Sequence, residues 1–289
     1  MRADRALLFR LATSRRWEQL VTSAPGGADQ AWRAASRYVA GRSWPEARPA
    51  AAALLAAGHG VSVDLFGELV TDPAEADRVR DGYLALAGEL PAGDAWLSVD
   101  LSHLAVDTDP AGAADRLAAV AAALPPGRRL QVGAEDAGRT DAVLGCLLDV
   151  AGRGLAHRLG GTLQANLRRS ADDLDVLVAA GVHVRLVKGA YLEAAGAHPH
   201  GEPTDLAFLR LGARLAEAGA PWSMATHDGR LREALLLAAG PVPVEQLFGV
   251  RPELLGELHD RGVPTRVYLP WGPAWFRYWM RRVAESRGA

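Results

Sequence analysis

Short runs of β-branched residues alternate with longer Ala- and Leu-rich segments over most of this chain. The alternation repeats eight times after Gly60, and the longer segments carry apolar residues at helical spacing. The eight runs begin near Val61, Trp96, Arg129, Gly161, His183, Pro221, Val244 and Thr265. Such units with compact connections favour parallel strands. Eight of them close most economically into a (β/α)8 TIM-type barrel, which we predict to be distorted.

The main alternative to a barrel is a doubly wound open sheet. No G-x-G-x-x-G motif follows a strand, so a Rossmann dinucleotide site is not supported. Before the first strand we expect helices over Asp4–Ser14, Gly27–Ala40 and Trp44–Ala57. We therefore predict a helical extension over residues 1–57, packed on a barrel over residues 58–289 that ends in a C-terminal helix.

Composition excludes several classes of protein. Of the 289 residues 49% are hydrophobic, which is enough for a sizeable core. The net charge of −2 argues against nucleic acid as a partner. The single cysteine, Cys146, excludes a disulfide scaffold. The longest charge-free stretch, Pro49–Val63, is too short to span a membrane. We predict a cytoplasmic protein, and peripheral contact with the inner face of the membrane stays open.

Lysine usage singles out one position. Lys and Arg total 32, and Lys188 is the only lysine. In a chain that otherwise uses arginine, a surviving lysine indicates either chance or a site that requires a compact ammonium.

Polar residues gather where the predicted strands end. The carboxyl ends of barrel strands meet at the catalytic mouth, so a polar series in every unit favours a site there over ordinary loop polarity. The series comprises Asp64, Glu68, Asp100, Ser102, Glu135, Asp136, Gln164, Asn166, Arg185, Lys188, Thr226, His227, Glu245, Gln246 and Tyr268.

The C-terminal segment carries a more local pattern. Tyr278 precedes Arg281 and Arg282 by three and four residues, so all three can share one side of a helix. Paired guanidinium groups suit a carboxylate or a phosphate, although a solvated basic helix end fits the spacing equally well. The stripe of Trp271, Trp275 and Trp279 indicates core packing. The pair His198 and His200 lacks a third ligand, so no metal site is predicted.

The segment Arg185-Leu-Val-Lys188-Gly-Ala-Tyr191 resembles the signature of the proline dehydrogenase family. Further segments resemble the family in the same order over about residues 35 to 287. These segments begin at Val63, Ser98, Gln164, Ala225, Leu247 and Tyr278. The chain is similar to the short monofunctional type.

This resemblance implies a barrel that holds FAD at its mouth and oxidises L-proline or a related secondary amine to its imine, with a quinone accepting the electrons. It gives catalytic roles to Arg185 and Tyr268. The residues that would bind the substrate are Arg281, Arg282, Tyr278, Asp100, Ala190, Tyr191 and Leu247. Those that would bind the cofactor are Gln164, Arg185, Val187, Lys188, Gly189, Ala134, Thr226, His227 and Glu285.

Four positions depart from the family pattern. One lies before Leu247, where the expected glutamine is displaced and Glu245 stands near its place. Asp100 stands where the family has a lysine, and Gly133 stands where it has the aspartate that pairs with that lysine. Asn166 replaces the tyrosine of a Gln-Ala-Tyr motif. The flavin site therefore looks largely kept and the substrate site altered, and we predict poor activity on L-proline.

The residues leave three alternatives open. The first is a specialised biosynthetic amine or hydrazine dehydrogenase that does not use proline, and whose substrate carries a cationic nitrogen for Asp100. The second is a Schiff-base lyase that uses Lys188. The third is a flavin-binding protein that has lost its activity.

Overall fold

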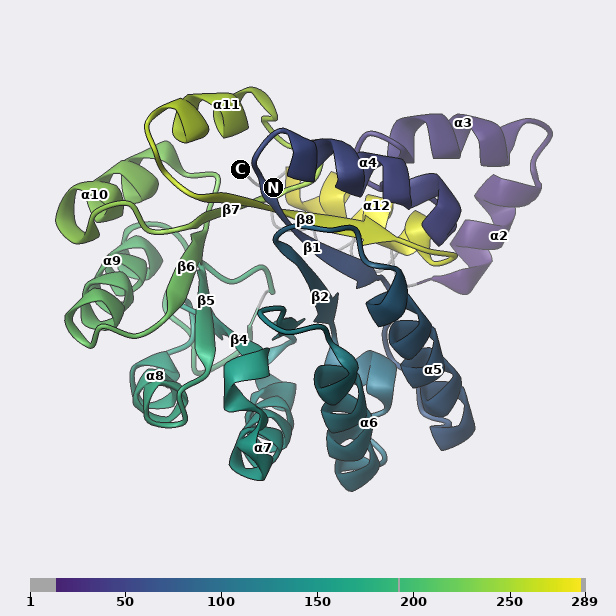
Figure 1. Cartoon of the computed structure of the whole chain (residues 1–289). Coiled ribbons are helices and arrows are strands. Elements are labelled where there is room, and N and C mark those ends of the chain that lie inside the picture. Colours follow the sequence, from purple (N-terminus) through teal and green to yellow (C-terminus); the bar gives the residue numbers. More distant parts are fainter. Residues whose placement is uncertain (1–13, 192, 287–289) are drawn as a thin grey trace.

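The computed structural model describes residues 14–191 and 193–286 and contains a closed barrel of eight parallel strands. The strands pair in sequence order, and β8 closes the barrel against β1 (Figure 1). They are β1 Gly60–Leu65, β2 Ala95–Val99, β3 Leu130–Val132, β4 Leu159–Gln164, β5 His183–Val187, β6 Trp222–Ala225, β7 Val244–Leu247 and β8 Thr265–Trp271. The predicted barrel is confirmed.

Seven helices that follow β1 to β7 surround the strands (Figure 1). Several begin at an aspartate whose side chain accepts backbone N–H groups, as Asp72 and Asp109 do before a first-turn proline. The seven are α5 Pro73–Glu89, α6 Pro110–Ala123, α7 Thr140–Val150, α8 Ser170–Ala179, α9 Glu202–Glu217, α10 Gly229–Ala239 and α11 Glu253–Asp260. Short helical turns are η1 Leu101–Leu104, η2 Ala137–Arg139, η3 Ala151–Leu155 and η4 Ala156–Arg158.

The distortion of the barrel lies in its last unit. The helix after β8, α12 (Trp275–Ser286), sends Tyr278 and Arg281 into the cavity at the carboxyl ends of the strands. Helix α4 (Trp44–Ala56) from the N-terminal part packs against β1 and β8 instead. The barrel thus takes one of its outer helices from the beginning of the chain, which frees α12 to contribute to the mouth.

The first helices differ from the sequence expectation. The expected helix Asp4–Ser14 lies outside the described residues except for Ser14, which accepts the Trp17 N–H and begins α2 (Arg15–Ser23). The second helix, α3, is Gly27–Ala35 rather than Gly27–Ala40. Ser14 does not end a helix, because its hydroxyl caps the start of the next one.

The N-terminal helices α2 and α3 lie beside the C-terminal helix α12 (Figure 1). Ala31 packs with Phe276 and Met280, and the Trp32 and Trp275 rings meet edge to face at 5.2 Å. Trp271, Trp275 and Trp279 all pack in partly buried positions, as expected for a core stripe.

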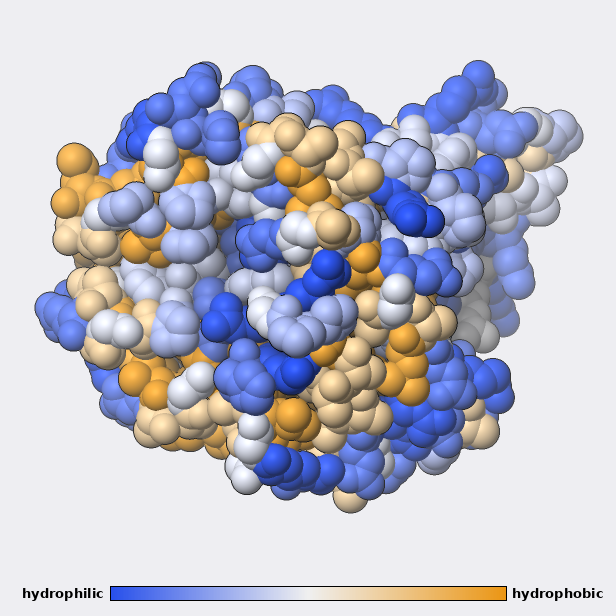
Figure 2. Space-filling model, viewed as in Figure 1, coloured by the Kyte–Doolittle hydropathy of each residue, from blue (hydrophilic) through white to orange (hydrophobic). Residues whose placement is uncertain are grey.

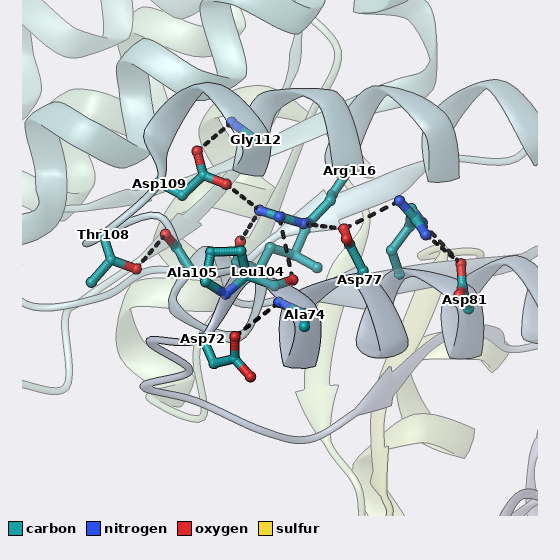
Figure 3. Close-up of polar contacts among 12 residues, drawn as sticks. Asp72, Ala74, Asp77, Asp81, Leu104, Ala105, Thr108, Asp109, Gly112 and Arg116 are labelled. Atoms are coloured by element: carbon teal, nitrogen blue, oxygen red, sulfur yellow. Dashed lines mark hydrogen bonds and ion pairs between the residues drawn. The ribbon is translucent and has the colours of Figure 1, made fainter.

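Arg116 joins three elements on the side of the barrel where β2 ends. Its guanidinium contacts Asp77 of α5 at 2.8 Å and Asp109 at the start of α6 at 3.0 Å (Figure 3). It also donates to the carbonyl of Leu104 in η1 at 3.3 Å. The Arg116 side chain is 7% exposed. This contact fixes the turn that follows Asp100.

Replacing Arg116 by methionine is expected to lower the free energy of unfolding by about 1–3 kcal/mol, because the buried Leu104 carbonyl loses a charged donor. The Asp77 and Asp109 carboxylates are partly exposed, so water compensates much of their loss. Urea denaturation measures the change. The matched control is Arg153→Met, which removes an arginine with more exposed ion pairs to Asp115 and Asp149. Equal losses in the two variants would contradict the structural role of Arg116.

The surface is mixed in character. On the face seen in Figure 2, hydrophobic residues form small groups among hydrophilic ones, as is usual for globular proteins. Among the described helices, none combines the length and the apolar character needed to span a bilayer.

Candidate active site

A cavity of about 340 Å³ opens at the carboxyl ends of the strands. It collects residues from most strands of the barrel and from α12. The predicted site residues that line it are Asp100, Ala134, Gln164, Arg185, Val187, Lys188, Gly189, Ala190, Tyr191, Thr226, His227, Leu247, Tyr268, Tyr278, Arg281 and Arg282. The side chain of Glu285 lies outside what the structure describes.

Other lining residues were not assigned a site role from the sequence. Phe66, Ser98, Thr162 and Ala225 gave no signal, because apolar or hydroxyl side chains near a strand end look like core. Glu245 and Gln246 belonged to the polar series at the strand ends and could have been assigned from it.

Arg185 on β5 is held by a buried carboxylate. Its Nη2 lies 2.7 Å from Glu245 Oε2 on β7 and donates to Ser62 Oγ at 3.2 Å. Ser223 donates to the other oxygen of Glu245 at 2.5 Å. Burial alone would raise the pKa of Glu245, but Arg185, Arg266 and the Ser223 hydrogen bond outweigh it and lower the pKa. The pair is therefore charged, and its contacts with Glu245 and Ser62 fix the orientation of the Arg185 guanidinium.

The two arginines of α12 have different surroundings. Arg281 forms an ion pair with Glu68, whose side chain is buried, and its guanidinium lies 5.8 Å from the centre of the Phe66 ring. The Arg282 guanidinium lies 5.1 Å from the centre of the Tyr278 ring. Glu68 and Phe66 follow β1, so the loop after the first strand positions an arginine of the last helix.

Tyr268 lines the cavity and forms a hydrogen-bonded pair with Asp64 behind it. Tyr268 donates to Asp64 Oδ2 at 2.5 Å, and Tyr83 donates to Oδ1 at 3.1 Å. Burial raises the pKa of Asp64 to about 6, although both tyrosine hydrogen bonds work in the opposite direction. Burial and the nearby Asp64 raise the pKa of Tyr268 well above its usual value, so its hydroxyl is neutral.

Asp100 lies over Gly133. A Cβ atom on Gly133 would collide with Asp100 Oδ1, so the carboxylate occupies space that only a glycine leaves free. Burial, followed by the charges of Asp64 and Glu135, raises the pKa of Asp100 well above its usual range. The two departures from the family pattern are therefore one physical feature.

Lys188 Nζ contacts Asp205 at 2.5 Å and Asp228 at 3.4 Å. Two carboxylates stabilise the charged ammonium, whereas a Schiff-base nucleophile needs the free amine. This arrangement disfavours the lyase alternative. It suits a lysine that presents positive charge at the edge of the cavity.

Several cavity-lining polar atoms are buried without a hydrogen-bond partner in the described part of the chain. They include Gln164 Oε1, Arg185 Nε, His227 Nδ1 and both side-chain polar atoms of Gln246. Burial, followed by nearby arginines, lowers the pKa of His227 to about 4, so its ring is neutral. Buried polar groups without partners are costly, and a ligand edge with alternating donors and acceptors would satisfy them. The residues present fit the polar edge of a flavin ring.

Gly189 has a backbone φ of +103°. A side chain there would also collide with the amide of Asn166. The strand-five motif therefore needs glycine at this point, and its backbone can approach a ligand closely.

Three comparisons relate the chain to known proteins. A family model described as "Proline dehydrogenase" matches residues 47–289. A protein of Deinococcus radiodurans named "Proline dehydrogenase" is 32% identical over 269 residues, covering 88% of this chain and 87% of the relative. "Proline dehydrogenase 1" of Bacillus subtilis subsp. natto is 30% identical over 262 residues, covering 87% of this chain and 86% of the relative.

Solved structures share the fold. The crystal structure of proline utilization A from Bdellovibrio bacteriovorus, inactivated by N-propargylglycine, matches with a TM-score of 0.82 and 20% identity. The match covers 97% of this chain and 36% of that protein, so the chain spans about a third of its length. The corresponding protein of Bradyrhizobium japonicum matches with a TM-score of 0.75 and 21% identity over 91% of this chain and 32% of its own.

Proposed function

The chain belongs to the proline dehydrogenase family, and from this premise we propose that it is an FAD-dependent oxidoreductase that converts a secondary α-amino acid of the proline class to its imine. The observation that carries the proposal is the composition of the cavity at the carboxyl ends of the strands. Unpartnered buried polar atoms from Gln164, His227 and Gln246 line it together with Arg281 and Arg282. The first set suits a flavin and the second a carboxylate.

Different residues of the chain bind the substrate and the cofactor. Arg281 and Arg282 bind the substrate carboxylate with forked donors. When FAD is bound, its polar ring edge would be held by Gln164, His227 and Gln246, and Lys188 would supply positive charge for it. Bound FAD supplies the acceptor for a hydride from the carbon next to the amine. Arg185 places a fixed positive charge beside the reaction, where negative charge develops.

Oxidation of the amine also releases a proton, and Asp64 and Tyr268 accept it. Tyr268 gives its hydroxyl proton to Asp64 Oδ2, 2.5 Å away, and takes the proton of the amine. The pKa of Asp64 is about 6, so the carboxylate is mostly ionised at neutral pH and still basic enough to serve. The rate is expected to rise as the pH passes upward through about 6, because only the ionised carboxylate accepts a proton.

The change Tyr268→Phe tests this relay. It removes the hydroxyl and keeps the ring, and it is expected to lower kcat about tenfold, since a water can replace the hydroxyl in part. The pH dependence near 6 should also change, because Asp64 loses its hydrogen bond. Flavin content and KM should change little. An unaltered pH profile with normal kcat would show that the proton leaves by another route.

The experiment that tests the proposed function is the visible spectrum of the purified protein, followed by anaerobic titration with L-proline and other secondary amino acids. A yellow protein whose flavin bleaches with one of these amines is the expected result. A colourless protein that takes up no FAD on reconstitution would overturn the proposal. A bound flavin that no amine reduces would favour a flavin-binding protein without this activity.

The proposed electron acceptor is a quinone, as the family resemblance implies, and the proposed location is the cytoplasm or the inner face of the membrane. Reoxidation of the amine-reduced flavin by a water-soluble quinone should be faster than by oxygen. Equal rates would contradict the quinone assignment.

A further inference from the structure

The carboxylates in and directly behind the cavity wall differ in whether they have a partner. Asp64 accepts from two tyrosines, Glu68 pairs with Arg281, and Glu245 pairs with Arg185. Glu135 accepts the Ser102 N–H at 2.6 Å and lies 3.6 Å from Arg139. The Asp100 carboxylate, which lines the cavity, makes no hydrogen bond or ion pair within the ranges 14–191 and 193–286 that the structure describes.

The backbone is arranged to keep this carboxylate in place. Asp100 precedes η1, where the His103 N–H donates to its backbone carbonyl at 3.0 Å, and Arg116 holds the end of the same turn. On the next strand, Gly133 has no side chain to compete for the space. Ser98 and Tyr191 also line the cavity, and both are uncharged. Among the described residues, the Asp100 carboxylate thus lies in the cavity without a cation in direct contact.

We propose that the substrate carries a second nitrogen, which is protonated and pairs with Asp100 while Arg281 and Arg282 bind the carboxylate. The inference rests on the proposed function and specifies its substrate class as a cyclic diamino acid. The remaining arrangement supports the assignment. Arg281 forms its ion pair with Glu68 and attracts Asp100 only at longer range, whereas a ligand cation can contact Asp100 directly.

The electrostatic surroundings point in the same direction. Burial, Asp64 and Glu135 all raise the pKa of Asp100, and the longer-range attraction of Arg281 does not compensate. An ammonium group in contact with Asp100 would favour its ionised form and relieve the repulsion among the three acids. The reacting amine is a weaker candidate for this position, because it must lose its proton and the pair of Tyr268 and Asp64 already provides the acceptor.

The chemistry of the reaction is unchanged by the second nitrogen. One C–H bond beside the ring amine would break, and FAD, when bound, would supply the acceptor for its electron pair and hydrogen as hydride. The ring N–H gives up its proton to the Tyr268–Asp64 pair, and a C=N bond forms. The second ammonium keeps its proton and binds only. Its contribution is therefore to specificity, as a difference in affinity between charged and neutral substrates.

The test compares matched substrates on the flavin-loaded enzyme. 4-Aminoproline is compared with 4-hydroxyproline of the same configuration, and piperazine-2-carboxylate with pipecolate, with L-proline as reference. Each pair differs mainly in one nitrogen. The rate of anaerobic flavin reduction and kcat/KM are measured for the wild type and for Asp100→Asn, which keeps the size of the side chain. Asp81→Asn, on an exposed ion pair with Arg80, controls for the loss of one charge.

The wild type is expected to prefer at least one amino substrate over its neutral partner by about tenfold or more, and Asp100→Asn is expected to abolish that preference. Flavin content and thermal unfolding show that the variant is intact. A wild type without such a preference would overturn the inference. So would an Asn variant that is slow with every substrate alike, because Asp100 would then serve the amine common to all. Failure of every amine to reduce the flavin would instead overturn the proposed function and the inference together.

Discussion

Exchange of the pair Asp100 and Gly133 for lysine and aspartate is expected to raise kcat/KM for L-proline about 100-fold. At about 5 Å in a partly screened site, a cation attracts a carboxylate by about 3 kcal/mol, and Asp100 offers no such attraction. The introduced aspartate would hold the lysine in the space that Gly133 leaves free. The measurement is kcat/KM for L-proline in the wild type, both single variants and the double variant.

Neither single change should match the double change. Gly133→Asp alone brings a Cβ atom into collision with Asp100 Oδ1 and adds a second carboxylate beside it. Asp100→Lys alone leaves the lysine without its intended partner. Residues in direct contact give coupling energies of about 0.5–3 kcal/mol, so the cycle should be strongly non-additive. If the wild type already oxidises proline as readily as its relatives, the charge argument is wrong and the substrate is proline itself.

Replacing Arg281 by methionine is expected to lower kcat/KM by roughly 30- to 1,000-fold, equivalent to about 2–4 kcal/mol, chiefly through KM. The substrate carboxylate loses a charged donor in a site shielded from water. Glu68 also loses its ion pair, so the double variant Arg281→Met with Glu68→Gln is needed to separate binding from folding. The double variant should keep its flavin and remain weak in substrate binding.

The control lies on the same helix. Arg277 is 3.7 Å from Glu18 of α2 and does not line the cavity. Arg277→Met should leave KM unchanged. An unchanged KM and kcat in Arg281→Met would instead favour the alternative, in which the two arginines form a solvated basic helix end.

The barrel could be predicted because its signals are local. The starts of the eight β-branched runs lie within two residues of the strand starts in the structure, as Val61 does for Gly60 and Gly161 for Leu159. Asp72 and Asp109 mark helix starts by their own side chains. The carboxyl ends of parallel strands all lie at the same end of a barrel. Residues at the strand ends could therefore be predicted to share one site.

The N-terminal helices were harder to predict, because their positions depend on distant residues. Trp17 and Val21 of α2 pack beside Phe276 and Met280, more than two hundred positions away in the chain. Nothing in the local sequence signals that contact. The same holds for α4, whose place against β1 and β8 depends on where α12 lies.

The sequence by itself predicted which residues stand at the mouth. That Asp100 and Gly133 replace a charged pair stays a prediction from the resemblance to the family. Only the tertiary structure decided which charges have partners. Arg185 pairs with Glu245, Arg281 with Glu68 and Lys188 with Asp205. Asp100 lines the cavity and forms no such pair within the described residues. The physical reason is that charge pairing depends on distances of a few ångströms between different units of the barrel. Those distances are fixed by closure of the sheet and not by any local pattern.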